Sequence, residues 1–432
     1  MSKLLGQRLV SLAEAADRIG DRGDILLPLP PAQPVGLLGE LGRRRGFRDL
    51  TIWCALLQRR FPLLELSGVH VKSQFYGAVE RAMQAEGRPI ENLPGDFHGL
   101  ALMARRIRPR IVASVVSPPD AEGFLSFGLH AGASEAEFYA AAQDPDRLAI
   151  AEVNREMPYT RGLAGHGEHR IHVSEVDLIV EHDEPLPTLP VVEPSADERG
   201  IAEWVSELIP DGATLQFGIG GVPNAMAELL AAGPRGDFGI HTEMLVDGIR
   251  LLHEAGKVTN RKGVYDGYTV CTFALGSRAL YDWAAAEPAV RFLPVAATNL
   301  PTIIGRNRRF ASINAALMVD LNGQVVADSI AGRPYSGVGG HESFVTGGRE
   351  AEGGKSILCL PSTYTSGGER RSRIVAALPT GSIVTTPRHQ VHWVATEHGA
   401  VELFGLTAKE RAEKLTSVAA PEFRDELRSA LR

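Results

Sequence analysis

Cysteine is scarce in this sequence, which has only Cys54, Cys271 and Cys359 in 432 residues. The three are far apart and none belongs to a C-x-x-C pair. We therefore expect neither a disulfide framework nor a cysteine-based zinc site. Isolated, reduced cysteines favour a location in the cytoplasm.

Long apolar runs are absent too. No stretch of about 18 uninterrupted apolar residues occurs, which argues against a membrane-spanning helix. The N-terminal segment MSKLLGQRLVSLAEAADRIGDRGD breaks its apolar residues with charges and lacks the small-residue cleavage site of a signal peptide. We expect a soluble protein with no membrane partner.

A surplus of basic charge is also missing. The chain has 45 Lys and Arg against 52 Asp and Glu, a formal net charge of -7. Binding to nucleic acid normally needs a basic face, so we expect no such partner. His389, His392 and His398 lack a metal-ligand spacing, and without a G-x-S-x-G motif no serine is a candidate hydrolase nucleophile. No bound metal is expected.

What the sequence does contain is an alternation of helical and strand patterns. Helical segments such as LVSLAEAADRI and IAEWVSELI alternate with short apolar runs such as DLTIWCALL, RIVASVVS and LAIAEV. This alternation is typical of α/β folds with parallel sheets covered by helices. The length favours two domains. The proline-rich segment 183–197 reads as the linker, which predicts domains at 1–190 and 191–432.

The C-terminal region has helix-start signals. Thr407 is followed three residues later by Glu410, the spacing of a capping box. Pro421 suits the first turn of a last helix. We expect two helices there.

A glycine-rich turn follows the apolar run ATLQF. It comprises Gly218, Gly220, Gly221 and Val222 and precedes a helix that we expect to begin near Asn224. Such a turn can direct backbone N–H groups at a negatively charged ligand. It differs from both standard phosphate loops, and a tight turn with close helix packing is an equal alternative.

Glu243 ends the next apolar segment, FGIHTE, before a helical pattern in VDGIRLLHEAG. If the two strands are parallel neighbours, Glu243 and the glycine turn share the edge where open α/β sheets bind ligands. A carboxylate beside backbone donors suits covalent acyl transfer. The alternative is a capping or salt-bridged acid. His241 mimics the H-x-E of zinc deaminases, but no P-C-x-x-C follows, so we expect it to orient a neighbour or to be packed.

A second glycine cluster lies in YSGVGGHESFVTGG at 335–348 and is followed by Lys355 in EGGKS. These glycines permit close approach of the backbone to a ligand, and a flexible loop is as good an interpretation. Lys355 could reach a phosphate or carboxylate, or be solvated.

Several segments together point to one family: SPPDAEGFLSFGLHA, IAEVNREMPYTRG, FGIGGVPNA, GIHTEM, SINAALMVDLNGQVVADS and VTTPRHQVHWVATEHGAVEL. With them the chain resembles the acetyl-CoA hydrolase/transferase family, which includes 4-hydroxybutyrate CoA-transferases. The resemblance extends over nearly the whole chain.

The resemblance implies two open α/β domains of the class I CoA-transferase type with the active site between them. Its catalytic glutamate maps to Glu243 and its oxyanion and coenzyme A loop to residues 218–222. Further coenzyme A contacts map to Asn299, Gly339, Gly340 and Lys355. The implied substrates are an acyl-CoA and a short-chain carboxylic acid, with a glutamyl-CoA thioester intermediate and no permanently bound cofactor. The oligomeric state is left open, a homo-oligomer included.

Two departures from the family pattern stand out. The family usually reads GGQ-x-DF where this chain has His341 and Ser343 after Gly339-Gly340, and its early glycine-rich turn is replaced by LPLPPAQPVG at 27–36. Two other functions stay open. One is an acyl-CoA hydrolase that uses the same glutamate, and the other is a metabolite-binding regulator without catalysis.

Overall fold

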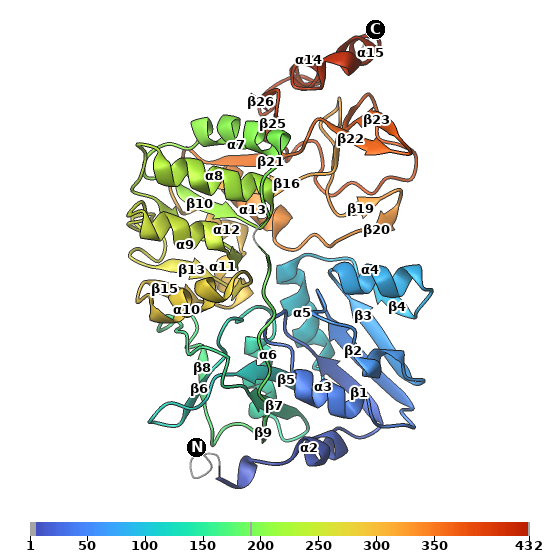
Figure 1. The fold of residues 1–432 in the computed structure, drawn as a ribbon, viewed down its shortest axis with the longest axis vertical. Helices are drawn as coiled ribbons and strands as arrows, with labels where there is room; N and C mark the ends of the chain where they lie inside the picture. The colour runs from blue at the N-terminus through green and yellow to red at the C-terminus, as the bar shows by residue number, and fades with distance from the viewer. Residues whose placement is uncertain (1–5, 191, 431–432) are drawn as a thin grey trace. The chain divides into compact units, whose positions relative to one another are not determined.

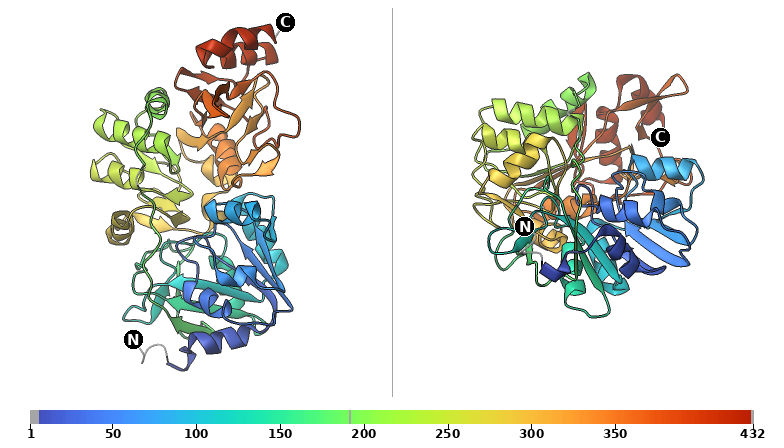
Figure 2. Two further views of the ribbon diagram at one scale, coloured as in Figure 1. Left: turned by 45° about the vertical axis from the view of Figure 1, so that its right-hand side comes forward. Right: turned by 60° about the horizontal axis from the view of Figure 1, so that its bottom comes forward.

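The computed structural model describes residues 6–190 and 192–430. Residues 1–5 of the N-terminal segment and residue 191 of the expected linker lie outside the described residues. The chain forms two compact units, Met1–Leu189 with Val270–Thr298, and Pro190–Thr269 with Asn299–Arg432. Both units are drawn in Figure 1 and, from two other directions, in Figure 2.

The segment Val270–Thr298 belongs to the first unit, although a division at residue 190 would assign it to the C-terminal domain. Backbone hydrogen bonds explain this membership. Ala131 and Gly132 donate to the carbonyl of Thr272 at 2.9 and 3.1 Å, and Val295 donates to the carbonyl of Gly132 at 3.0 Å. As functional domains, 1–190 and 191–432 stay a prediction.

The first unit is built on a seven-stranded sheet in the order β4-β3-β2-β1-β5-β7-β9. All its neighbouring strands are parallel. All six residues of β5 are buried, as expected for a strand covered on both faces. The sheet strands are β1 (Arg22–Leu26), β2 (Asp49–Cys54), β3 (Val69–Ser73), β4 (Ile90–Asn92), β5 (Ile111–Val116), β7 (Leu148–Val153) and β9 (Leu178–Glu181).

The other elements of this unit are short. The helices are η1 (Gly6–Arg8), α2 (Leu12–Ile19), α3 (Val35–Leu41), η2 (Pro62–Glu65), α4 (Ala78–Ala85), α5 (Phe97–Ile107), α6 (Glu135–Ala142), α10 (Arg278–Ala286) and α11 (Val295–Thr298). The remaining strands are β6 (Phe124–Ser126), β8 (Arg170–His172), β14 (Phe273–Ala274) and β15 (Val290–Phe292). Strand β13 (Thr269–Cys271) spans the boundary between the units.

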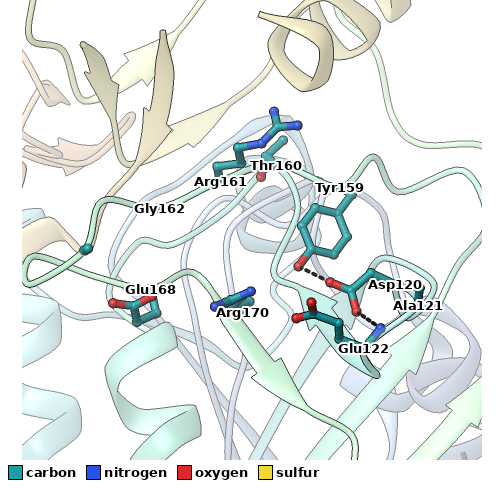
Figure 3. A pocket seen from close by; sticks show the side chains of 10 residues that line it. Asp120, Ala121, Glu122, Tyr159, Thr160, Arg161, Gly162, Glu168 and Arg170 are labelled. Atoms are coloured by element: carbon teal, nitrogen blue, oxygen red, sulfur yellow. Dashed lines mark hydrogen bonds between the residues drawn. The ribbon is translucent and has the colours of Figure 1, made fainter. Parts of the chain in front are cut away.

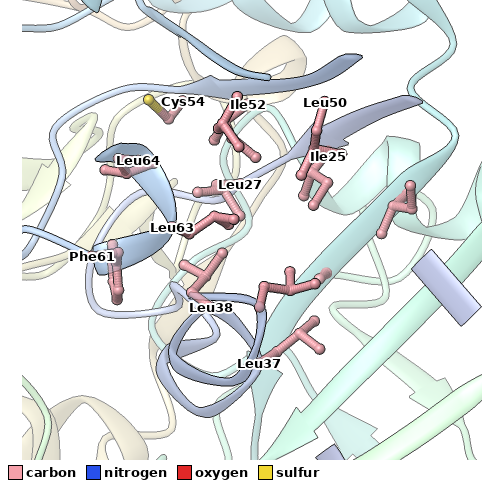
Figure 4. Packing of buried hydrophobic residues seen from close by; sticks show 14 of the residues in the cluster. Ile25, Leu27, Leu37, Leu38, Leu50, Ile52, Cys54, Phe61, Leu63 and Leu64 are labelled. Carbon is pink, nitrogen blue, oxygen red and sulfur yellow. The ribbon is translucent and has the colours of Figure 1, made fainter. Parts of the chain in front are cut away.

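The proline-rich segment 27–36 is part of the core of this unit. Leu27 packs with Leu37 and Leu38 of α3 and with the apolar face of β1 and β2 (Figure 4). Both oxygens of the buried Glu152 accept from the first backbone N–H groups of α3, from Gly36 at 3.0 Å and Leu37 at 2.8 Å. A carboxylate at a helix N-terminus satisfies donors that have no partner within the helix.

The second unit contains a six-stranded sheet in the order β11-β10-β16-β21-β25-β26. Its strands are parallel up to β25, and β26 is antiparallel. Helix α8 lies between α7 and α9 (Figure 1), and α13 packs on β16 and β21. The sheet strands are β10 (Thr214–Phe217), β11 (Gly239–Ile240), β16 (Phe310–Ala315), β21 (Lys355–Cys359), β25 (Trp393–Thr396) and β26 (Gly399–Glu402).

Small hairpins and helices complete the second unit. Its helices are α7 (Ala196–Leu208), α8 (Gly221–Ala232), α9 (Asp247–Glu254), α12 (Pro301–Ile304), α13 (His341–Glu350), α14 (Ala408–Ser417), η3 (Pro421–Phe423) and α15 (Arg424–Ser429). Its other strands are β12 (Met244–Leu245), β17 (Met318–Asp320), β18 (Val325–Val326), β19 (Ser329–Ile330), β20 (Arg333–Pro334), β22 (Thr363–Ser366), β23 (Glu369–Ser372) and β24 (Ile374–Val375).

These elements confirm the α/β class and its parallel sheets. The capping box at the start of α14 forms as expected, with Thr407 Oγ1 accepting from the Glu410 backbone at 3.3 Å. The strand expected in FGIHTE is shorter than predicted, because β11 ends at Ile240. The glycine cluster at 335–348 contains the start of α13, so its second half is a helix and not a flexible loop.

Candidate active site

Glu243 lies just beyond the carboxyl end of β11, the edge strand of the second sheet. Strands β10 and β11 are parallel neighbours, with Leu215 opposite Ile240. This confirms the predicted pairing. The turn after β10 and Glu243 therefore both lie at the carboxyl ends of the strands. Glu243 itself is half-buried.

The carboxylate of Glu243 is held by Asn299. The Asn299 side chain is fully buried, and its Nδ2 donates to Oε2 of Glu243 at 2.5 Å. A hydrogen bond donated to a carboxylate favours its ionised form, the form that acts as a nucleophile. The structure therefore brings together two residues that the sequence singled out 56 positions apart.

Gly340 lies against the same carboxylate oxygen. A Cβ atom at Gly340 would overlap Oε2 of Glu243 and would lie 2.6 Å from Nδ2 of Asn299. Gly340 is also the N-cap of α13. The carboxylate therefore packs against the positive end of a helix, where negative charge is stabilised. Gly339 precedes it with a φ of 55°, a conformation that glycine adopts readily.

His241, two residues before Glu243, is packed inside the second unit. It is fully buried, and its ring stacks on Tyr265 with centroids 6.0 Å apart. Its Nδ1 lies 3.3 Å from Nδ2 of Asn307, and the ring of Phe344 from α13 lies 6.5 Å away. The expectation that His241 is packed is confirmed.

The glycines of the turn after β10 differ in their surroundings and backbone conformation. Gly218 has open space where a side chain would go, and Gly220 has a φ of 128°, which strongly favours glycine. A Cβ at Gly221 would overlap the carboxylate of Glu198 in α7. Gly221 and Val222 begin α8 and are buried, so close helix packing accounts for Gly221.

Lys355 lies away from Glu243, and its contact with coenzyme A stays a prediction. It is the first residue of β21, opposite Ala311 near the start of the parallel strand β16. In a parallel sheet all strands begin on one side and end on the other. Lys355 therefore lies at the amino ends of the strands, whereas Glu243 lies at their carboxyl ends. The glycines before Lys355 suggested a ligand-facing turn, but they form the entry to a strand.

Cys359 is the last residue of β21 and, like Glu243, lies at the carboxyl ends of the strands. Its thiol is a second type of potential nucleophile. It is buried, and burial raises the pKa of its thiol to about 12. The thiol therefore stays protonated and unreactive at neutral pH. Glu243 is the stronger candidate at this edge.

Sequence reasoning missed Thr386. Its hydroxyl contacts both His341 and Glu342, the first two residues of α13. No local motif marks a threonine 45 residues from its partner.

The first unit has a cavity of about 500 Å³ (Figure 3), and one residue of its lining, Thr160, also belongs to a buried polar cluster. Beneath Thr160, His169 Nδ1 lies 2.6 Å from Glu135, and His169 Nε2 lies 3.1 Å from Thr160 Oγ1. This spacing resembles a catalytic triad. However, Nε2 also faces the carbonyl of Gly128 at 2.8 Å, which requires a donor, so it cannot accept the threonine proton. The cluster is a packing network. The cavity is lined by Asp120, Ala121, Glu122, Tyr159, Thr160, Arg161, Gly162, Ala164, Glu168 and Arg170.

Among residues 6–190 and 192–430, no group of three or more His, Cys, Asp or Glu side chains is arranged to hold a metal ion. None of the helices in that part of the chain is long and apolar enough to cross a bilayer.

Comparison with known proteins identifies the family. Residues 276–431 match the model of the acetyl-CoA hydrolase/transferase C-terminal domain. The chain is 36% identical over 435 residues to a succinyl-CoA:cyclohexane-1-carboxylate CoA transferase of Geobacter metallireducens, covering 99% of this chain and 95% of the relative. The chain belongs to the acetyl-CoA hydrolase/transferase family.

Other members of the acetyl-CoA hydrolase/transferase family agree. A 4-hydroxybutyrate coenzyme A transferase of Clostridium kluyveri is 39% identical over 356 residues, covering 82% of this chain and 80% of the relative. The crystal structure of RipA from Yersinia pestis superposes with a TM-score of 0.90 at 35% identity, covering 100% of this chain and 98% of that one. The resemblance seen in the sequence motifs is confirmed, and the family is enzymatic.

Proposed function

We propose that this chain transfers coenzyme A from an acyl-CoA to a carboxylic acid, with Glu243 as the covalent nucleophile. The main support for this proposal is the surroundings of the Glu243 carboxylate. Asn299 donates to it at 2.5 Å, and the N-cap glycine of α13 packs against it. The names of the relatives as CoA transferases support the same reaction.

The first half-reaction loads coenzyme A onto the enzyme. Oε1 of Glu243 attacks the acyl carbonyl carbon, the C–S bond breaks, and coenzyme A leaves as a thiolate. The resulting mixed anhydride is attacked at Cδ of Glu243 by that thiolate. The Cδ–Oε1 bond breaks, the donor acid leaves as a carboxylate with Oε1, and a glutamyl-CoA thioester remains.

The second half-reaction reverses these steps with the acceptor. Its carboxylate attacks Cδ, expels the thiolate and forms a new anhydride. The thiolate then attacks the acceptor carbonyl, which frees the new acyl-CoA and restores the Glu243 carboxylate with one oxygen from the acceptor. The net reaction moves coenzyme A from one carboxylate to another of similar basicity, so it needs no further reagent.

Asn299 has a defined part in these steps. Each attack on Cδ places negative charge on Oε2, the oxygen that Asn299 Nδ2 already contacts. A donor placed in advance at a developing oxyanion lowers the barrier. The N-terminus of α13 adds a favourable field at the same oxygen. The turn formed by Gly218, Gly220, Gly221 and Val222, with Gly339, is proposed to contact coenzyme A.

Hydrolysis is the second candidate, because the family model describes hydrolases as well as transferases. Water in place of the acceptor acid would cleave the same thioester, so exclusion of water from Cδ separates the two activities. We favour transfer, since both relatives compared above are named as transferases.

The proposal includes substrates and location. We propose short-chain aliphatic acids as substrates and coenzyme A as a substrate, not a resident cofactor. The reaction is proposed to take place in the cytoplasm, where the buried free thiols of Cys54, Cys271 and Cys359 stay reduced.

An acyl-CoA panel assayed with and without added acid tests the proposal. We expect coenzyme A exchange that depends on acetate, butyrate or 4-hydroxybutyrate and disappears in Glu243→Ala. Acid-independent release of free coenzyme A, also lost in Glu243→Ala, would establish the hydrolase instead. Stoichiometric acyl-CoA binding without turnover would favour the regulator. Cyclohexane-1-carboxylate as a better acceptor than butyrate would overturn the short-chain assignment.

A further inference from the structure

Two side chains in the first turn of α13, His341 and Glu342, contact the hydroxyl group of Thr386. His341 Nε2 lies 2.8 Å from Oγ1 of Thr386, and the same oxygen lies 2.5 Å from Oε1 of Glu342. Thr386 is fully buried. Both side chains at the start of the helix therefore end on the same atom.

Hydrogen counting fixes the direction of these bonds. The Thr386 hydroxyl has one hydrogen, and the ionised Glu342 carboxylate can only accept, so Thr386 donates to Glu342. His341 must then donate from Nε2 to the hydroxyl oxygen. Burial lowers the pKa of His341 to about 4, so the ring is neutral and keeps this tautomer at neutral pH.

The backbone of Thr386 is itself held in place. Thr386 donates to the carbonyl of Val325 at 3.2 Å, and Val325 donates back to the carbonyl of Thr386 at 3.1 Å. This antiparallel bridge ties residue 386 to β18. Thr386 is therefore a fixed point for the start of α13.

The other side of the same helix start faces Glu243. Gly340 immediately precedes His341, and its Cα leaves no room for a Cβ beside Oε2 of Glu243 and Nδ2 of Asn299. A shift or rotation of the first turn would change the space available to this carboxylate. The packing of Phe344 on Phe310, with ring centroids 6.1 Å apart, anchors the next turn of α13.

We propose that Thr386 is a positioning residue for Glu243, because its hydroxyl fixes the first turn of α13 against which the Glu243 carboxylate and the Asn299 amide pack. The inference rests on the proposed function and extends it to Thr386, whose hydroxyl contacts His341 and Glu342. It also gives His341 a role. Glutamine at this position would have an amide that can donate to the same hydroxyl.

Thr386→Val tests the inference, because it removes the hydroxyl and nearly keeps the shape. We expect kcat to fall about 10- to 100-fold with little change in KM for acyl-CoA, since a displacement on the order of 1 Å costs about 10² in rate. Thr386→Ser keeps the hydroxyl and should recover most of kcat. His341→Gln should be close to wild type, and His341→Leu should resemble Thr386→Val.

Thr385→Val is the matched control. The Thr385 hydroxyl donates to Asp328 at 2.5 Å and accepts from the Ala327 backbone at 2.8 Å, so it serves the 327–328 segment and not α13. We expect a lower melting temperature with wild-type kcat. Equal losses of kcat in Thr385→Val and Thr386→Val would reduce Thr386 to a purely structural residue and overturn the proposal.

A second measurement separates this inference from the proposed function. In protein labelled with ¹⁵N-asparagine, the Asn299 side-chain amide signal, assigned by its loss in Asn299→Ser, reports the bond to Glu243. Thr386→Val should shift this signal and Thr385→Val should not. If the wild-type protein has no acyl-CoA activity, the proposed function is wrong. The shift of the Asn299 signal still tests whether Thr386 positions Glu243 and Asn299. An unmoved signal together with unchanged kcat overturns it. Should Thr386→Val not fold, His341→Leu takes its place in both measurements.

Discussion

The side-chain amide of Asn299 donates a 2.5 Å hydrogen bond to Oε2 of Glu243, and both residues belong to the second unit. We expect Asn299→Ala to lower kcat by about 10² to 10³, the usual effect of losing one oxyanion donor. KM for acyl-CoA should change little, because the bond is to the enzyme's own carboxylate. Steady-state kinetics at saturating acceptor checks this. A raised KM with unchanged kcat would make Asn299 a substrate-binding residue instead.

Glu243 should become trapped only during turnover. A glutamyl-CoA thioester is reduced by borohydride, whereas a free carboxylate is inert, so we expect inactivation only after exposure to acyl-CoA. Mass spectrometry should place a coenzyme A adduct on the peptide containing Glu243 before reduction. In Glu243→Asp the carboxylate is retracted by one methylene, and we expect a folded protein with about 10²-fold lower activity. An adduct on another acid would contradict the assignment.

Gly340→Ala should separate catalysis from folding. The added Cβ overlaps the far end of the Glu243 side chain, which can move, so we expect a near-normal melting temperature. The displaced carboxylate should lower kcat by about 10². Gly39→Ala is the control, since a Cβ there meets nothing within 4 Å. Wild-type kcat in Gly340→Ala would show that the carboxylate position is not critical.

Gly221→Ala should act on stability through α7. The Cβ would displace Glu198, whose Oε2 accepts from Ser195 N and Oγ at 2.8 Å each in the capping box of α7. Loss of a helix cap costs about 1 kcal/mol. The same substitution in a Glu198→Ala background should cost much less, which a double-mutant cycle by urea unfolding measures. Additive effects would rule out the Gly221–Glu198 contact as the cause.

Lys262 should make stability depend on pH. Its amine is buried, donates to the carbonyls of Tyr265 and Tyr268 at 2.6 Å, and has its pKa lowered to about 7 by burial. Between that value and 10.5, the ordinary pKa, the unfolded chain binds one proton more than the folded chain. The free energy of unfolding should therefore rise with pH in this window. Below the window the folded protein buries a charged amine, so the free energy of unfolding is reduced by the full cost of that burial.

Lys262→Met removes this effect. The stability of wild type relative to Lys262→Met should increase by about 1.4 kcal/mol per pH unit between the two pKa values. Urea unfolding at several pH values measures the slope. Exposed Lys409→Met is the control and should give a flat difference. A flat difference for Lys262→Met as well would show that the amine is not perturbed by burial.

Local signals in the sequence predicted much of this protein. The capping box of Thr407 and Glu410 and the strand–turn–helix at 214–232 each depend on residues a few positions apart, and both formed. The motifs also identified the family and singled out Glu243 together with Asn299 and Gly340. A helix cap or an alternating strand specifies its own backbone, so such features can be read without knowing the rest of the chain.

Only the tertiary structure decided which of these residues meet. Lys355 follows glycines, as a ligand-binding lysine could. However, it begins β21 and so lies at the amino ends of the strands, opposite to Glu243. Thr386 has no motif, but a bridge to Val325 brings it to the start of α13. Gly221 faces Glu198 because α7 packs on α8. Contacts between residues tens of positions apart depend on strand order and helix packing, which arise from burial of the whole core and leave no local trace in the sequence.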